Sequence, residues 1–444
     1  MKQGHEKHNE RRARTRFHDE TGAYYLLDNA AIIMPAVSDR RNTFLFRMSA
    51  TLDHPVVLSA LVAALKRTAA RFPYFMVRLK RGFFWYFLLP MDREPVPEYD
   101  DGPPNLGFSL KRRNEFLFRV RVSGRRIACE FTHILSDGTG CFVFLKTLLR
   151  QYFRELGVES TPGPDDLDID AEPDPSEYED AYHRFYKPGV PTPGPVPQAF
   201  HLDSPLMPPD RYRVTCGIMP VEALLAQAKS RGVSLTEFLV AVYLDALVAI
   251  RTSLARTGRK LRPVVCMEVP VNMRKFYPTR TLRNFSLFAL PSVDTRLGTW
   301  TFDELVEHVH HQLRIEAGER RMATQIARNA GGSRMLAVRL MPLVVKDFFA
   351  HLLFERLGEG MMSGMLSNLG PVVMPPELAG RIERFDFVGA PSKIIKTGAS
   401  MLTWNGNAYI SFHSMAVSRD VERLFFSRLA SLGVPVRVEC SMEA

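Results

Sequence analysis

Three residues that suit a proton-transfer site stand close together in the first third of this chain. His133 ends an apolar segment, and Asp137 and Gly138 follow it shortly before a helix-like run from Cys141 to Phe153. A neutral imidazole held at a strand end can accept the proton of a hydroxyl or an amine as that group attacks a carbonyl carbon. The pattern therefore predicts a general base at His133.

The other two motif residues are expected to shape the turn behind the histidine. Asp137 is too near in sequence to be a second substrate-facing carboxylate, so we expect it to point into the protein, pair with a cation and hold the loop. Gly138 is expected to permit a tight backbone. The competing interpretation is a strand-end histidine with an Asp-Gly turn and no chemistry, because short patterns of this kind also arise by chance.

The segments around the motif predict an α/β lobe. A hairpin with strands at Phe116–Val122 and Arg126–His133 places the histidine at the outgoing end of a central strand. A strand at Thr43–Leu52 alternates apolar side chains on one face, and Asp53 is expected to cap the helix that follows it. The motif is thus expected to lie where a strand passes into a helix.

The chain divides into four segments by composition. Residues 1–20 form a basic arm that we expect to be solvated, and residues 21–156 form an N-terminal lobe that carries the motif. Residues 157–210 are rich in proline, glycine and acidic side chains, which predicts an extended crossover with little core of its own. Residues 211–444 return to strands and helices, so a second α/β lobe is expected there.

The overall composition is that of a globular protein with a basic balance. The 444 residues are 46% hydrophobic and 24% charged, and the formal net charge is +10. A basic protein favours polyanionic partners, but no paired Cys/His spacing, basic-aromatic RNA motif or clear helix-turn-helix indicates nucleic-acid binding. The five cysteines are scattered and odd in number, which is typical of reduced thiols in a cytoplasmic protein.

Membrane-spanning segments are not expected from the sequence. No signal peptide is expected, because the first residues are charged and no apolar core follows them, and no uninterrupted apolar run reaches transmembrane length. The nearest candidate, Met335–Phe354, is broken by Arg339, Lys346 and Asp347. We expect it to be an apolar helix in a groove between the lobes, with a membrane-surface helix as the alternative, so peripheral membrane contact stays open.

Two further clusters have a plain structural interpretation. His308, His310 and His311 lack a well-spaced carboxylate or thiolate partner, so we expect a solvated helix face and no metal site. The aromatic run Phe83–Phe87 could line an acyl or acceptor channel, but strand core is the expectation.

The order of these features resembles the CoA-dependent acyltransferase superfamily, which includes chloramphenicol acetyltransferase, condensation domains of peptide synthetases, alcohol acetyltransferases and wax ester synthases. The resemblance extends from about Tyr24 to Val438 and centres on the His-x-x-x-Asp-Gly motif. It also includes Ala70-Arg71-Phe72-Pro73, Val233-Ser234-Leu235-Thr236, Val269-Pro270-Val271-Asn272-Met273-Arg274 and Ser367-Asn368-Leu369-Gly370.

The resemblance implies an α/β fold of two chloramphenicol-acetyltransferase-like lobes, each a sheet covered by helices, with a tunnel between them. His133 would be the general base at the middle of the tunnel. An acyl-CoA or an acyl-carrier protein would enter from one mouth, and an alcohol or amine acceptor from the other. No cofactor would be tightly bound, since acyl-CoA would be a co-substrate.

Other site residues follow from the same resemblance. Arg274 would form a structural ion pair with Asp137, and Asn284 would line the tunnel. Ser367 and Asn368 would contact the substrate, with the Ser367 hydroxyl or nearby backbone N–H groups stabilising the oxyanion. The alternatives are that Arg274 is a surface arginine at the start of a loop, and that Ser367 and Asn368 form a polar turn before Gly370-Pro371.

The chain departs from the family pattern at two positions. Thr132 stands where many relatives carry a first histidine, and Arg283 stands where glycine usually precedes Asn284. The Asp-Phe-Gly-Trp-Gly signature of the plant BAHD acyltransferases, another branch of the superfamily, is absent, which argues against that branch. The expected function is therefore that of an alcohol-acetyltransferase-like enzyme that moves acetyl or another short acyl group from CoA to an alcohol or amine. The alternative is a non-catalytic or carrier-protein-dependent condensation-like protein that binds acyl thioesters.

Overall fold

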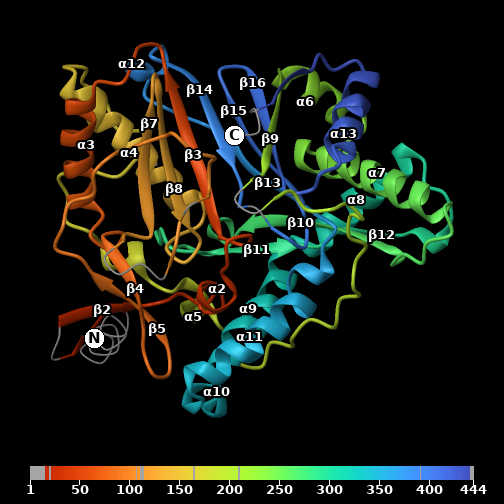
Figure 1. Cartoon of the computed structure of the whole chain (residues 1–444), viewed down its shortest axis with the longest axis horizontal. Coiled ribbons are helices and arrows are strands. Elements are labelled where there is room, and N and C mark those ends of the chain that lie inside the picture. The colour runs from red at the N-terminus through yellow and green to blue at the C-terminus, as the bar shows by residue number, and fades with distance from the viewer. Residues whose placement is uncertain are drawn as a thin grey trace.

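Two large sheets, each with helices on its outer side, form the body of the protein (Figure 1). The structure is a computed structural model that describes residues 16–19, 22–106, 108–110, 115–163, 166–208, 211–390 and 392–440. Residues 1–15 of the expected basic arm lie outside the described residues. Residues 16–19 form a strand, so the end of the expected arm is part of a sheet.

A five-stranded sheet builds the N-terminal lobe. Its strands, in spatial order, are β14 (Ile382–Val388), β3 (Leu45–Leu52), β8 (Arg126–Thr132), β7 (Phe118–Ser123) and β6 (Glu98–Tyr99). Helices α3 (Leu58–Arg71) and α4 (Gly138–Glu155) cover one face (Figure 1). The core between them is aromatic: the buried rings of Phe131 and Phe144 meet edge to face at 5.4 Å.

Strand β14 reaches this sheet from the C-terminal half of the chain. It runs antiparallel to β3, with Phe385 opposite Ala50 and Val388 opposite Arg47. The division of the chain at residues 156 and 211 therefore does not hold for β14. Composition could not show this exchange, because the pairing depends on the path of the chain and not on the residues of the strand.

Helix α3 begins later than the sequence predicts, and the expected cap is wrong. The N-cap is Val57, which makes no side-chain cap hydrogen bond. The Val57 N–H instead donates to the Tyr152 hydroxyl of α4 at 3.1 Å. Asp53 lies outside the helix and pairs with His54 at 2.5 Å. A tertiary partner thus takes the place of the local cap.

An eight-stranded sheet builds the C-terminal lobe. Its strands, in spatial order, are β11 (Ser286–Ala289), β10 (Val264–Asn272), β13 (Gly364–Pro371), β15 (Thr397–Trp404), β16 (Asn407–Ser414), β9 (Arg213–Pro220) and β17 (Arg437–Cys440), with β12 (Ser292–Asp294) also on β10. Its covering helices are α6 (Val221–Ser230), α7 (Leu235–Ala255), α8 (Phe302–Glu316) and α13 (Asp420–Ser431) (Figure 1). The pairing of β10, β13 and β15 is parallel, so their carboxyl ends meet at one edge.

Helix α7 is a core helix of this lobe. Ser234 and Glu237 close a capping box at its start. Within the described part of the chain it is the one helix that is long and apolar enough to cross a membrane. Its side chains Phe238, Val242 and Tyr243 are fully buried in the lobe's core, which accounts for that apolar composition.

A smaller sheet and a helical arm complete the fold at the lower end in Figure 1. The sheet contains β1 (Arg16–Asp19), β2 (Gly22–Leu26), β5 (Tyr86–Pro90) and β4 (Val77–Arg81). The remaining helices are α2 (Met34–Val37), α5 (Ala181–Phe185), α9 (Glu319–Arg334), α10 (Leu336–Leu340), α11 (Leu343–Leu357) and α12 (Pro376–Ala379). The segment expected as one helix over Met335–Phe354 is divided at Pro342, because the residue before proline avoids helical geometry.

The acidic crossover is fastened to the N-terminal lobe by ion pairs. Arg71 donates two hydrogen bonds to the buried Glu177 carboxylate, at 2.6 and 2.8 Å. Lys146 pairs with Asp166 at 2.9 Å. The crossover is therefore extended and also anchored, and its acidic residues neutralise buried cations of the first lobe.

Candidate active site

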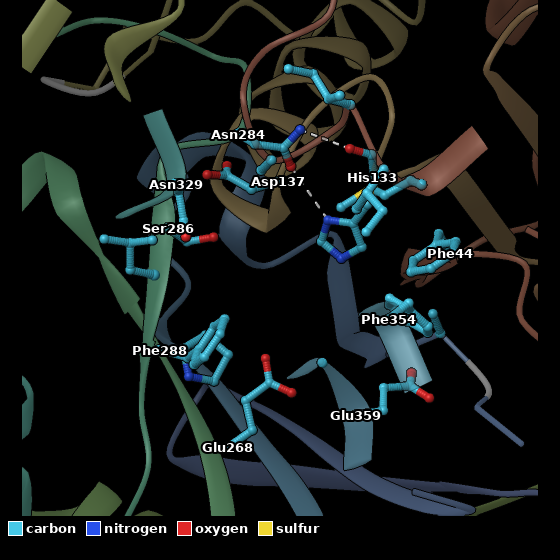
Figure 2. Close-up of a pocket in the computed structure, with 18 of the residues that line it drawn as sticks. Phe44, His133, Asp137, Glu268, Asn284, Ser286, Phe288, Asn329, Phe354 and Glu359 are labelled. Atoms are coloured by element: carbon cyan, nitrogen blue, oxygen red, sulfur yellow. Dashed lines mark hydrogen bonds between the residues drawn. The ribbon is translucent and has the colours of Figure 1, made fainter. Parts of the chain in front are cut away.

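A cavity of about 1230 Å³ lies between the lobes. Its wall combines the motif segment of the N-terminal lobe with β10, β13 and α11 from the C-terminal half. Figure 2 shows His133 and Asn284 on one side of the open space, and Glu268 and Glu359 on the other. The exposed area of the lining is mainly apolar and polar side chains are set among it, which is typical of small-molecule sites.

Strand β8 delivers His133 to the cavity wall. The His133 backbone N–H donates to the Phe44 carbonyl at 2.9 Å, and its ring lies 4.4 Å from that of Phe46. The ring Nδ1 is 3.5 Å from Asn284 Oδ1, whereas no described residue bonds to Nε2, which faces the open space (Figure 2). A proton on Nδ1, donated to Asn284, leaves the Nε2 lone pair free toward the cavity.

Burial keeps the His133 ring in its neutral form. Removal from water lowers the pKa of His133 below its ordinary value of 6.5, and the nearby Asp137 charge and the Asn284 hydrogen bond oppose this shift only in part. A neutral imidazole at neutral pH is the form that a general base requires.

Asp137 fixes the start of helix α4 and also reaches the other lobe. Its Oδ1 accepts hydrogen bonds from the backbone N–H groups of Thr139 and Gly140, both at 3.2 Å. Its Oδ2 accepts from the Phe285 N–H at 2.8 Å. The carboxylate is therefore engaged by the protein, and its bonds join the motif to the loop before β11.

The ion pair expected between Asp137 and Arg274 is present. Arg274 Nη1 lies 2.8 Å from Asp137 Oδ2, and Nη2 lies 3.2 Å from Oδ1. The same guanidinium donates to the carbonyls of Thr281 at 2.9 Å and Arg283 at 2.6 Å. Arg274 does not belong to the described lining of the cavity. Arg274 therefore joins the turn at Asp137 to the loop that contains Thr281 and Arg283.

Asn284 is held by a carboxylate that sequence reasoning missed. Its Nδ2 donates to the His133 carbonyl at 2.7 Å and to Asp28 Oδ2 at 2.9 Å. Burial raises the pKa of Asp28 to about 6, although the charge of Arg283 opposes the shift. Asp28 lies in an irregular segment after β2, where no periodic pattern could have singled it out.

Arg283, which replaces the usual glycine of relatives, has a structural place. Its side chain is buried, with Nε 3.6 Å from Asp28 Oδ2 and Nη1 donating to the Leu26 carbonyl at 2.6 Å. The extra side chain is therefore accommodated by a carboxylate and a carbonyl, and Asn284 still reaches the histidine.

Ser367 and Asn368 reach the cavity from β13 and both line it. The Asn368 amide is used within the protein: Nδ2 donates to Thr236 Oγ1 at 3.0 Å, and Oδ1 accepts from the Gly370 N–H at 2.8 Å. Asn368 thus shapes the strand end, which leaves the Ser367 hydroxyl as the simpler donor toward a substrate.

The tight backbone contact of the motif lies at Gly140, which sequence reasoning missed. Neither Gly138 nor Gly140 has a positive φ. A Cβ at Gly138 would lie 3.1 Å from the side chain of Leu369, which borders the cavity, and 3.4 Å from that of Met48. A Cβ at Gly140 would overlap the Leu282 carbonyl and the Ser136 hydroxyl. Close approach of two loops, and not the turn itself, is what requires glycine here.

Thr132 lies away from the cavity. It is fully buried, and its Oγ1 accepts a hydrogen bond from the Ile134 N–H at 3.0 Å. It is not part of the described cavity lining. At the position of the first histidine in relatives, this chain therefore has a hydroxyl that shapes the turn.

Two further carboxylates that sequence reasoning missed line the cavity opposite His133. Glu268 lies within β10, and no described residue forms a hydrogen bond or ion pair with its carboxylate, whereas Glu359 accepts from the Ser392 hydroxyl at 2.7 Å. Burial raises the pKa of both to about 7, and the Glu359 charge adds to the shift at Glu268. A lone carboxylate within an apolar strand was the signal that could have found Glu268.

The aromatic run after β4 is not strand core. Phe83 and Phe84 are 71% and 40% exposed, whereas Trp85 and Tyr86 line the cavity. The expectation was wrong because Phe83, Phe84 and Trp85 lie in the turn between β4 and β5 beside α11, whereas Tyr86 and Phe87 begin β5.

The expected solvated face of α8 is also only partly right. His311 is exposed, but His308 Nε2 lies 3.0 Å from the Ser292 carbonyl and His310 Nδ1 lies 3.2 Å from Glu237. Over the residues that the structure describes, no group of three His, Cys, Asp or Glu side chains could hold a metal ion.

Comparison by sequence finds no relative: no protein-family model and no curated protein sequence matches the chain. Comparison of the folds does find similar solved structures. The trichothecene 15-O-acetyltransferase TRI3 from Fusarium sporotrichioides matches with a TM-score of 0.58 at 13% identity, over 94% of this chain and 96% of its own.

Two other matches carry different activities in their names. A wax ester synthase/diacylglycerol acyltransferase from Marinobacter aquaeolei VT8 has a TM-score of 0.52 at 13% identity, over 92% of this chain and 97% of its own. The epimerization domain of tyrocidine synthetase B has a TM-score of 0.52 at 10% identity, over 88% and 91%. At such identities the similarity establishes the fold alone, and the chain has the two-lobed α/β fold shared by chloramphenicol-acetyltransferase-like acyltransferases and condensation-type domains.

Proposed function

We propose that the protein moves an acyl group, acetyl or another short one, from a CoA thioester to an alcohol or amine, with His133 as the general base. The observation that carries this proposal is the free Nε2 of a buried neutral histidine that faces a cavity between two lobes. The shared fold of an O-acetyltransferase and a wax ester synthase supports acyl transfer to a hydroxyl.

In the proposed step, His133 Nε2 accepts the proton of the acceptor as the acceptor's oxygen or nitrogen attacks the thioester carbonyl carbon. The carbon–sulfur bond then breaks, and the imidazolium returns its proton to the CoA sulfur. The Ser367 hydroxyl is proposed to donate to the oxyanion between these two events. Asp137 and Arg274 act as positioning residues, because they hold the loops that carry His133 and Asn284.

Acyl-CoA is the proposed co-substrate, with an acyl-carrier protein as the alternative donor and no tightly bound cofactor. The net charge of +10 suits the phosphates of CoA or an acidic carrier surface. The cytoplasmic location inferred from the cysteines stays a prediction.

Release of free thiol from acetyl-CoA, measured against a panel of alcohols and amines, tests the proposal. His133→Ala should slow release by at least about 100-fold while the melting temperature is retained. His311→Ala is the matched control, since this side chain is 67% exposed and remote from the proposed base, and it should leave the rate unchanged.

Two outcomes would contradict the proposal. Release that persists in His133→Ala would remove the histidine from the base role. Saturable acetyl-CoA binding by calorimetry without release under any acceptor would favour the non-catalytic or carrier-protein-dependent alternative.

A further inference from the structure

Helices α10 and α11 and the turn between β4 and β5 lie at the lower end of the molecule (Figure 1), and they expose a group of apolar side chains. Five large apolar side chains there are each between 62% and 71% exposed. They are Phe83, Leu336, Leu340, Val344 and Phe348, and we name this surface the apolar tip. Soluble proteins rarely leave a contiguous apolar surface of this kind uncovered unless it binds something.

Hydrogen bonds make the turn and the helix one surface. The Leu343 N–H donates to the Phe83 carbonyl at 2.8 Å, and Lys346 Nζ donates to the Phe84 carbonyl at 2.8 Å. On α11, Val344 and Phe348 are four residues apart and so lie on the same helix face. Leu343, the first residue of α11, is buried beneath this surface's turn-helix contact. The exposed side chains therefore belong to a fixed platform and not to separate loops.

The charge around the apolar tip is positive. The sequence segments 78–86 and 334–352 contain a single carboxylate, Asp347, which Arg81 already pairs at 2.9 Å. The same segments contain six basic residues, of which Arg81 and Lys346 bond to Asp347 and to the Phe84 carbonyl; the other four are Arg78, Lys80, Arg334 and Arg339. Protruding phenylalanine and leucine beside lysine and arginine is the composition of surfaces that bind anionic lipid.

The apolar tip also continues into the cavity. Phe349, which is 46% exposed, lines the cavity together with Val338 and Met341. A molecule that lies against the tip is therefore next to an apolar entrance on the same helices.

We propose that the apolar tip docks on the surface of an anionic phospholipid bilayer, with the phenylalanine and leucine side chains in the interfacial region and the basic residues at the headgroups. The charge argues against a second copy of this chain as the occupant, because a two-fold interface would bring like charges together. Docking does not depend on the proposed reaction, and it would place the cavity entrance at the membrane.

Co-sedimentation with vesicles tests the proposal without any turnover. Vesicles of equal parts phosphatidylcholine and phosphatidylglycerol should bind the protein, and added salt should weaken binding. Val344→Ser with Phe348→Ser should lower the partition coefficient at least about tenfold. Arg334→Glu with Arg339→Glu should weaken binding to these vesicles.

The matched control is Leu297→Ser with Ile315→Ser. These side chains are 76% and 69% exposed on other elements, so the same loss of apolar surface should leave vesicle binding unchanged. All of these positions are exposed, so the melting temperature should not fall in any variant.

Three results would overturn the proposal. One is no binding to either anionic or pure phosphatidylcholine vesicles. Another is binding that survives the tip variants but is lost when Arg11, Arg12 and Arg14 are replaced by Gln. That result would show that the basic arm, and not the apolar tip, binds the membrane. The third is a concentration-dependent dimer that Phe348→Ser abolishes without any vesicle binding, which would make the tip an interface between copies.

Discussion

The Asp137 carboxylate and the Arg274 guanidinium meet at 2.8 Å at the junction between the His133 turn and the loop that presents Asn284. Both side chains are nearly buried, at 5% and 13% exposed. Neither residue needs to touch a substrate for this pair to matter, since it holds in place the two segments that do face the cavity.

Loss of this ion pair should lower the stability of the fold, because the pair has a structural and not a direct chemical role. Asp137→Ala leaves the Arg274 charge unpaired and uncaps α4, so the free energy of unfolding should fall by about 3–5 kcal/mol, measured by urea denaturation. Glu94→Ala, which breaks an exposed pair with Lys66, should change it by about 0.5 kcal/mol or less. Finding Asp137→Asn fully stable but inactive would instead indicate a direct chemical role.

The pH dependence of the reaction should report the buried imidazole. A base must be unprotonated, and burial lowers the pKa of His133 below 6.5, so the acid limb of kcat/KM should have its midpoint below that pH. The Asp137 charge raises the same pKa, so Asp137→Asn should move the midpoint further down. A wild-type midpoint above 6.5 would rule out His133 as the titrating base.

Glu268 is expected to make the stability of the fold depend on pH. Its pKa is raised from 4.5 to about 7, so the folded protein holds a proton that the unfolded chain releases, and stability is lost as pH rises across that window. Glu268→Gln should therefore be more stable than the wild type above pH 7, by about 1–3 kcal/mol, with the difference vanishing toward acid pH.

Thermal denaturation across pH checks this expectation. Glu307→Gln serves as the control, because that side chain is 76% exposed and should give no such difference. A wild type and Glu268→Gln that stay equally stable at all pH values would mean that the carboxylate is not held in an apolar environment.

The sequence predicts those parts of the site that rest on local pattern. The hairpin around Gly124 and the helix after Asp137 both form near their expected bounds, because each depends on neighbours in the chain.

Residues whose role depends on contacts distant in the sequence could not be predicted from local sequence patterns. Asp28 gains its role from Asn284, and Arg283 fits because Asp28 is there, across more than half of the chain. The cap expected from Asp53 failed for the same reason, since Tyr152 supplies the bond instead. Contacts of this kind depend on the packing of the lobes and leave no periodic trace.

The two glycines of the motif segment test whether local turn geometry or a contact distant in the sequence sets the requirement for glycine. Gly140→Ala should destabilise the protein by about 3 kcal/mol or more, because the added Cβ would overlap the backbone carbonyl of Leu282 and force the loops apart. Gly138→Ala should cost about 1 kcal/mol or less, since the added Cβ would meet only the ends of two side chains, Leu369 and Met48, and no backbone atom. Gly332→Ala in α9 meets nothing within 4 Å and should be neutral or stabilising. Urea denaturation of the three variants measures the order, and a Gly138→Ala loss equal to that of Gly140→Ala would show that the turn, and not the contact between lobes, sets the requirement for glycine.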